Sequence, residues 1–203
     1  MQTTLLLIRH GLTDWNAEHR WQGHQDIPLN DTGIDQARAL ARRLANWPIR
    51  ALYSSDLQRA AQTADILAAA VNLQVTRDRA WRERDVGAFQ GLTRVEIKNQ
   101  YPQEFSAMIQ GNINPPGGED NQNLHARAVT AFDTLLARHP GEMVAAVSHG
   151  GLLHTVLLHV LGLPIGAYGR LSLRGNTGLN IVEVTDGRPR LSRLNDTAHL
   201  ETI

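Results

Sequence analysis

The chain of 203 residues contains no cysteine, which excludes disulfide bonds, thiolate metal ligands and thiol nucleophiles. Aromatic residues make up only 5%, and the formal net charge is zero, so no overall field favours nucleic acid or an anionic membrane. No apolar run approaches the roughly 20 residues of a membrane-spanning helix. We therefore expect a cytoplasmic protein without a nucleic-acid or membrane partner. Any affinity for anions must come from a local group of cations.

The residues that are present have the composition of an ordinary globular domain, with 42% hydrophobic and 20% charged side chains. The length allows one domain with a substantial core, and we find no internal repeat or long linker. Residues 4–8 are apolar after the first, Thr4, and this short run is followed by Arg9 and His10. This run is too short for a signal peptide and instead predicts a buried strand. We therefore predict a single domain over residues 1–203.

Strands and helices are expected to alternate along most of the chain. Apolar residues at helical spacing predict one helix that begins near Thr32 as its N-cap, and a second that begins at Ser55 or Asp56. Residues 143–147 predict a second buried strand followed by a helix. Residues 179–184 and 191–194 predict a terminal hairpin. This alternation predicts an α/β fold, a three-layer α/β/α sandwich with a mainly parallel central sheet.

The two strongest strand predictions end in similar residues. Arg9, His10 and Gly11 follow the first strand, and Ser148-His149-Gly150-Gly151 follows the later one. Parallel strands end at the same edge of a sheet, where ligands bind in such folds. Glycine allows a tight turn there, and free N–H groups at the start of a helix favour an anion. We therefore expect the two histidines to face one cleft, although a structural role for each remains an alternative.

Two arginines are candidates for holding an anion at this edge. Arg9 would place a permanent positive charge at the end of a buried strand, where it needs an anionic partner. Arg59 lies in the first turn of a predicted helix, the end at which the helix dipole disfavours cations. A phosphate would satisfy both guanidinium groups. The alternatives are an internal carboxylate for Arg9 and a salt bridge between Arg59 and Asp56.

The sequence around these residues resembles the histidine phosphatase superfamily, in particular its branch of cofactor-dependent phosphoglycerate mutases and broad-specificity phosphatases. The similarity follows the chain in order and spans nearly all of it. It includes LIRHGLTDWN at 7–16, YSSDLQRA at 53–60, ER at 83–84, PGGE at 116–119, VSHGG at 147–151 and NDTAHL at 195–200. An RHG sequence alone is only suggestive, whereas this ordered set is specific.

The resemblance implies a metal-independent phosphomonoesterase with a phosphoglycerate mutase-like fold. It makes His10 the phosphorylated nucleophile, Glu83 the general acid and base, and Arg9, Arg59 and His149 the core of the phosphate site. A protonated His149 would add a third cation. Neutral imidazole is available near pH 7, and phosphoryl transfer needs mainly positioning and charge neutralisation. Other positions that the resemblance places around phosphate or substrate are Thr13, Asn16, Gln22, Gly23, Arg84 and Gly150.

Several readings of the function stay open. The short interval between Glu83 and His149 favours a phosphatase that acts on small phosphomonoesters without a cofactor, whereas the segment up to Arg94 resembles a mutase dependent on 2,3-bisphosphoglycerate. A non-catalytic phosphate-binding module is a third reading. A metallohydrolase is a fourth, but no HExxH or HxH pattern occurs, and His149 and His154 lack the i, i+4 spacing of paired helical ligands.

The substrate cannot be read from the sequence. Leu12 and Asp120 stand where the family commonly has Glu and Ser, which leaves the fine preference open. Residues from about 84 to 120 are expected to cap the cleft and to decide the substrate. Apolar edge strands would permit a homodimer without requiring one.

Overall fold

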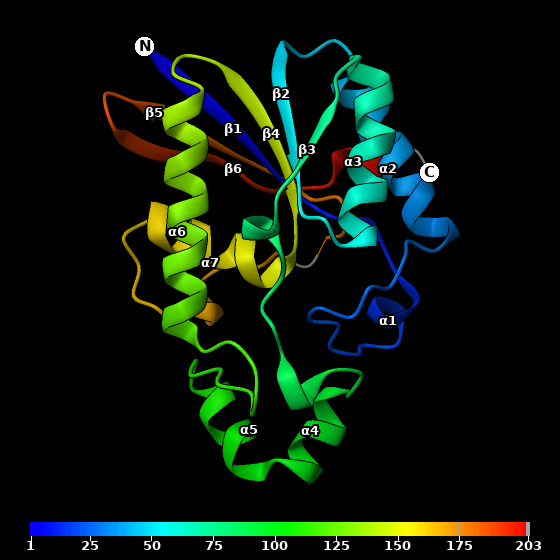
Figure 1. Ribbon diagram of the computed structural model, residues 1–203, viewed down its shortest axis with the longest axis vertical. Coiled ribbons are helices and arrows are strands. Elements are labelled where there is room, and N and C mark those ends of the chain that lie inside the picture. Colours follow the sequence, from blue (N-terminus) through cyan, green and yellow to red (C-terminus); the bar gives the residue numbers. More distant parts are fainter. Residues whose placement is uncertain (174, 202–203) are drawn as a thin grey trace.

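The computed structural model describes residues 1–173 and 175–201. Its centre is a six-stranded sheet with the order β3-β2-β4-β1-β5-β6 (Figure 1). Neighbouring strands among the first four are parallel, and β5 is antiparallel to both β1 and β6, which confirms the mainly parallel sheet and the terminal hairpin. The strands are β1 (Gln2–Arg9), β2 (Ile49–Ser54), β3 (Val75–Arg77), β4 (Met143–Ser148), β5 (Leu179–Thr185) and β6 (Arg188–Asp196).

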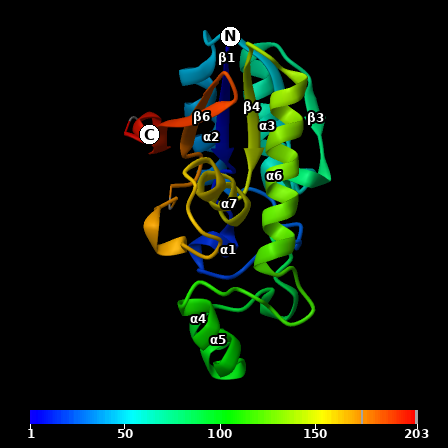
Figure 2. The same cartoon turned by 90° about the vertical axis from the view of Figure 1, so that its left-hand side faces the viewer.

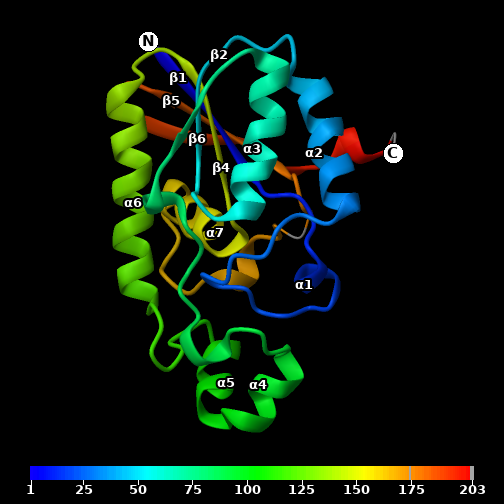
Figure 3. The same cartoon turned by 45° about the vertical axis from the view of Figure 1, so that its right-hand side comes forward.

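Helices cover both faces of the sheet, as Figures 1 and 3 show. One face packs against α2 (Asp31–Leu44) and α3 (Gln58–Val71), and the other against α6 (Asn121–Arg138) and α7 (Gly150–Val160). Successive residues of a strand point to opposite faces. Leu6 and Ile8 accordingly join the first core, and Leu5 and Leu7 the second. This confirms the three-layer sandwich and explains why residues 5–8 of β1 are all apolar.

Both helices of the first layer begin differently from the prediction. Asn30, not Thr32, is the N-cap of α2, since its side chain accepts a hydrogen bond from Gly33 N at 2.9 Å. Neither Ser55 nor Asp56 is the N-cap of α3; that position is Leu57, which makes no side-chain cap.

The carboxylate of Asp56 is engaged elsewhere, in two 2.6 Å contacts with Arg82. This pairing also replaces the salt bridge to Arg59 that we kept as an alternative. The free N–H of Gln58 at the start of α3 donates instead to Asp26 at 2.6 Å.

The segment between β3 and α6 projects beyond the end of the sheet (Figure 2). It contains η1 (Arg79–Trp81), η2 (Gly87–Phe89), α4 (Arg94–Gln100) and α5 (Pro102–Ile109). Val86, Phe89 and Ile97 form a small core of their own within it. The assignment of residues 84–120 as a cap over the active site stays a prediction.

Short helical segments complete the fold: α1 (Asp14–Ala17), η3 (Tyr168–Arg170) and η4 (Ala198–Leu200). Within the two described ranges, no helix has both the length and the apolar character needed to cross a bilayer.

Candidate active site

The two histidine segments meet at neighbouring strand ends. β1 and β4 pair in parallel with Arg9 opposite Ser148, and His10 N donates to Ser148 O at 2.9 Å. The next residue on each strand is a histidine, and the ring centres of His10 and His149 lie 5.1 Å apart. The predicted meeting of the two histidines is therefore confirmed, but of the two only His10 lines the cavity over this point, because His149 is fully buried. This cavity has a volume of about 1130 Å³, slightly above the usual size of a ligand pocket.

His10 is held with one ring nitrogen free of protons. Its Nδ1 lies 2.7 Å from Gly11 O, and because a carbonyl only accepts hydrogen bonds, Nδ1 must carry the proton. Burial, together with the charges of Arg59 and Arg9, lowers the pKa of His10 well below its ordinary value. The ring is therefore neutral at pH 7, with Nε2 unprotonated, which is the form that a nucleophilic imidazole requires.

Arg59 is fixed from three sides in the first turn of α3. Its NH1 donates to Gln25 O and its NH2 to Gly23 O, both at 2.8 Å, and its Nε donates to His149 Nδ1 at 3.2 Å. Burial lowers its pKa to about 10, against the opposing charges of Glu83 and Asp26. Arg59 remains a cation at neutral pH, in the wall of the cavity.

His149 is not the third cation that a protonated ring would supply. Its Nδ1 accepts the hydrogen bond from Arg59, so this nitrogen is unprotonated. Burial and the charge of Arg59 lower the pKa of His149 well below its ordinary value. The neutral ring carries its proton on Nε2, which is buried and has no hydrogen-bonding partner within residues 1–173 and 175–201. His149 is therefore an uncharged donor in this structure.

Arg9 supplies the second cation of the cavity wall. Its NH1 donates to Leu173 O at 3.0 Å, and its guanidinium lies beside Gly150, where an added Cβ would be 3.6 Å from Nε. Burial lowers the pKa of Arg9, and the charge of Glu83 opposes this shift. Arg9 and Arg59 thus flank His10 with two permanent positive charges.

Glu83 lies across the cavity at the start of α7. Its carboxylate accepts backbone N–H groups of Gly151 at 3.0 Å, Leu152 at 3.1 Å and Arg84 at 2.8 Å. A Cβ on Gly151 would approach Glu83 Oε1 to 2.6 Å, so only glycine allows the carboxylate this close. Three donors and the N-terminal end of a helix dipole suit a negatively charged group.

Thr13, Asn16 and Gln22 form one hydrogen-bonded group at the cavity edge. Thr13 Oγ1 accepts from Gln22 Nε2 at 2.8 Å and donates to Asn16 Oδ1 at 3.1 Å. Asn16 and Gln22 line the cavity, as does Gly23, whereas Thr13 is fully buried behind them. With its oxygen engaged, Asn16 offers its amide NH₂ to a ligand.

Arg84 also reaches the cavity wall, but its guanidinium serves the protein itself. NH1 donates to Ile113 O and Glu119 O, and NH2 donates to Asn121 Oδ1 and Tyr168 Oη, all within 2.9 Å. The expected contact of Arg84 with substrate therefore stays a prediction, and these bonds favour a role in joining the projecting segment to α6 and η3.

Part of the wall comes from residues that sequence reasoning did not select as site residues. They lie between α5 and α6, within α7, or between α7 and β5, and no residue pattern in the sequence selected them as site residues. His154 lies one turn beyond Gly150, and its ring is 5.1 Å from that of Tyr168. Further members are Ile113, Arg170, Leu173 and Asn176. No group of three or more potential metal ligands occurs in the part of the chain that the structure describes.

The family model described as the histidine phosphatase superfamily (branch 1) matches residues 5–197. The chain belongs to this superfamily. Phosphoglycerate mutase-like protein 4 of Arabidopsis thaliana is 37% identical to this histidine phosphatase over 97% of this chain and 86% of that protein. The metal-independent phosphoserine phosphatase of the same plant is 34% identical over 99% of this chain and 84% of that protein.

A solved structure of similar shape is the phosphoserine phosphatase of Entamoeba histolytica, in mutant form and in complex with phosphoserine. The match covers 98% of this chain and 99% of the Entamoeba chain, with a TM-score of 0.89 and 28% identity. The phosphoglycerate mutase-like fold and the membership of a phosphomonoesterase family are thus confirmed.

The buried histidines also predict how the stability of this histidine phosphatase depends on pH. The pKa values of His10, His149 and His154 are lowered chiefly by burial, and that of His199 is lowered to about 4. In the unfolded chain each would bind a proton below about pH 6.5. We therefore expect the free energy of unfolding to fall as the pH drops from 6.5 towards 5, by up to about 1.4 kcal/mol per histidine and pH unit.

Urea unfolding followed by circular dichroism at several pH values checks this prediction. His199→Gln removes one of these four histidines, one that is not part of the cavity wall, so the pH dependence should become shallower in that variant. Equal free energies of unfolding at pH 7 and pH 5 in the unmodified chain would contradict the expectation.

Proposed function

We propose that this histidine phosphatase hydrolyses small phosphomonoesters in two displacements at His10. The observation that carries the proposal is the environment of His10 Nε2: an unprotonated nitrogen beside two fixed guanidinium groups and opposite the carboxylate of Glu83, in one cavity. Family membership, and the phosphatases among the relatives, support the same reaction.

In the first displacement, His10 Nε2 attacks the phosphorus atom while the bond from phosphorus to the bridging oxygen breaks. The leaving alkoxide is a strong base and needs a proton as it departs. Glu83 supplies that proton as the general acid, starting from its protonated form in the substrate complex. The products are phosphohistidine at residue 10 and a neutral alcohol.

In the second displacement, water attacks the phosphorus atom and the bond to Nε2 breaks. Glu83, now ionised, accepts a proton from this water, so inorganic phosphate leaves and both side chains return to their starting states. Arg9 and Arg59 balance the charge of the phosphoryl oxygens in both steps, while the Nε2–H of His149 and the amide of Asn16 donate hydrogen bonds. Preorganised donors of this kind each contribute about 2.7–4 kcal/mol in other enzymes.

A metal ion or organic cofactor has no assigned task in this scheme. Two guanidinium groups take the role that a divalent cation has in other phosphoryl-transfer enzymes. The name of the metal-independent plant relative supports this assignment. The substrate is proposed to be a small molecule, since the phosphoserine phosphatase of Entamoeba histolytica has been solved with phosphoserine and with 3-phosphoglyceric acid.

A panel of small phosphomonoesters tests the proposal through release of inorganic phosphate. We expect turnover of p-nitrophenyl phosphate and of at least one phosphorylated hydroxy acid, unchanged within about twofold after treatment with a chelator. A chain that is inactive over the whole panel would instead be a phosphate-binding module. Loss of activity with the chelator, restored by a metal, would contradict the metal-independent scheme.

A phosphoglycerate mutase remains the second candidate, because one of the two Arabidopsis relatives is named phosphoglycerate mutase-like protein 4. A mutase returns the phosphoryl group to another hydroxyl of the substrate instead of to water. Conversion of 3-phosphoglycerate to 2-phosphoglycerate that depends on 2,3-bisphosphoglycerate, without release of phosphate, would establish this reading over hydrolysis.

A further inference from the structure

Glu83 belongs to a stretch of chain that forms neither helix nor strand, between η1 and η2. Such a stretch has no ladder of backbone hydrogen bonds to fix its position. The carboxylate nevertheless meets the first N–H groups of α7 at 3.0 and 3.1 Å. Something outside the segment must therefore hold the backbone of Glu83 in register with α7.

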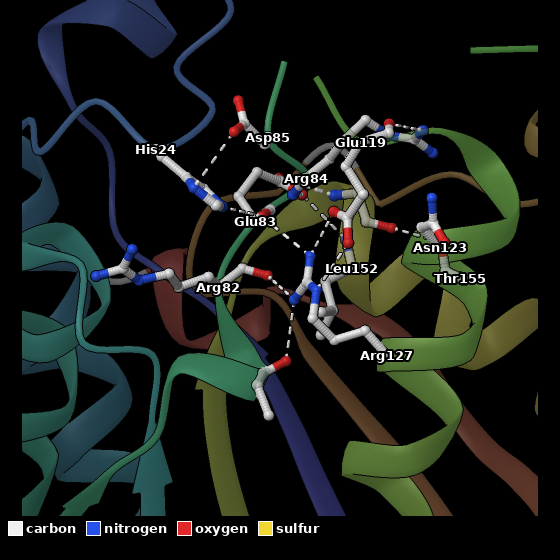
Figure 4. A network of polar contacts seen from close by, with 12 residues as sticks. His24, Arg82, Glu83, Arg84, Asp85, Glu119, Asn123, Arg127, Leu152 and Thr155 are labelled. Atoms are coloured by element: carbon white, nitrogen blue, oxygen red, sulfur yellow. Dashed lines mark hydrogen bonds and ion pairs between the residues drawn. The ribbon is translucent and has the colours of Figure 1, made fainter. Parts of the chain in front are cut away.

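Arg127 of α6 provides part of that hold, together with His24, whose Nε2 lies 2.9 Å from Glu83 O (Figure 4). NH1 of Arg127 donates to Ala80 O at 3.0 Å and Arg82 O at 2.7 Å, and its NH2 donates to Glu83 O at 3.2 Å. Its Nε and NH2 also donate to the two carboxylate oxygens of Glu119, at 2.9 and 2.6 Å. These five bonds use all five N–H donors of the guanidinium.

Glu119 connects the guanidinium of Arg127 to the point at which the projecting segment rejoins the main fold. Its N donates to Asp85 O at 2.8 Å, and its O accepts from Arg84 NH1 at 2.9 Å. The side chains of Arg127 and Glu119 are only 23% and 16% exposed, so water screens their ion pair weakly. Neither residue belongs to the cavity wall, so neither is placed to touch substrate.

We propose that Arg127, oriented by Glu119, is a positioning residue that sets the place of the general acid Glu83. The inference rests on the proposed function, because it matters only if Glu83 transfers a proton to the bridging oxygen as the phosphorus–oxygen bond breaks. An alkoxide needs that proton far more than p-nitrophenolate, which is stable as an anion. Displacing Glu83 must therefore slow the phosphorylation of His10 by alkyl phosphates more than by p-nitrophenyl phosphate.

The test compares kcat/KM for these two kinds of substrate in Arg127→Met and Arg127→Lys. This ratio reports the steps up to departure of the alcohol, so slow hydrolysis of the phosphohistidine does not obscure the effect. In Arg127→Met we expect a loss of about 30- to 100-fold on an alkyl phosphomonoester that the wild type hydrolyses, and less than about threefold on p-nitrophenyl phosphate. Lysine keeps the charge but not the five-donor plane, so Arg127→Lys should fall between wild type and Arg127→Met.

Two comparisons separate positioning from a general loss of structure. Arg138→Met changes an exposed arginine of the same helix and should leave both substrates unaffected. In a Glu83→Gln background, adding Arg127→Met should lower kcat/KM by less than about a further threefold. The side chain at position 83 then has no acidic proton to donate, so its position no longer matters for protonation. If Arg127→Met does not fold, Arg127→Lys carries both comparisons.

Equal losses on the two substrates, or additive losses in the double variant, would overturn the positioning role while leaving the proposed function intact. A wild-type chain that hydrolyses neither substrate would overturn the proposed function, and this inference with it.

Discussion

Replacing His10 with alanine is expected to lower kcat for p-nitrophenyl phosphate by at least about 10⁴-fold, a loss typical of removed covalent nucleophiles. Nε2 of His10 is the unprotonated imidazole nitrogen that the hydrogen bond from Nδ1 to Gly11 O leaves free. The neighbouring ring of His149 does not replace it, because its Nδ1 already accepts from Arg59 and its Nε2 carries the proton. The two guanidinium groups remain in place, so the variant should still bind phosphate although it no longer turns over substrate.

Rapid quenching of the reaction with a substrate that carries radioactive phosphorus measures the intermediate directly. We expect one labelled residue, stable in alkali and labile in acid as phosphohistidine is, in the wild type and none in His10→Ala. His125→Ala, which changes a histidine of α6 that is not part of the cavity wall, should retain both label and turnover. Label on any residue other than His10, or turnover retained without His10, would contradict the two-displacement scheme.

The strand ends explain why so much of this site is readable from sequence. A run that is apolar at every position predicts a central strand, and parallel neighbours bring their carboxyl ends together whatever their distance along the chain. His10 and His149 satisfy both conditions, so their meeting follows from the pattern of two short segments. Arg59 is predictable for a related reason, since a cation at the start of a helix needs negative charge nearby.

Other features depend on contacts that no local pattern encodes. The N-cap of α3 was wrongly predicted because Asp56 binds Arg82, 26 positions away. The neutral state of His149 depends on a hydrogen bond from Arg59 across 90 positions. Ion pairs between distant segments compete with local capping, and their outcome is decided only when the chain is packed. For the same reason, the sequence alone does not distinguish Arg127 from the other charged residues of α6.

Replacing Arg59 with methionine is expected to lower kcat/KM by about 10³-fold, somewhat more than the loss of a single neutral donor, because a buried charge is removed as well. Arg59 lowers the pKa values of both His10 and His149, second only to burial. Without it, both pKa values rise, and protonation of His10 then removes the nucleophile at a higher pH. The acid limb of the kcat/KM profile should therefore move to higher pH.

Arg59→Lys separates the effect of charge from that of hydrogen bonding. Lysine keeps a cation in the wall but cannot bind Gly23 O, Gln25 O and His149 in one plane as the guanidinium does. Its kcat/KM should fall, while its acid limb stays near that of the wild type. If the methionine variant kept the wild-type acid limb despite a large loss of rate, the charge of Arg59 would not govern His10, and the neutral nucleophile would owe its state to burial and to Arg9.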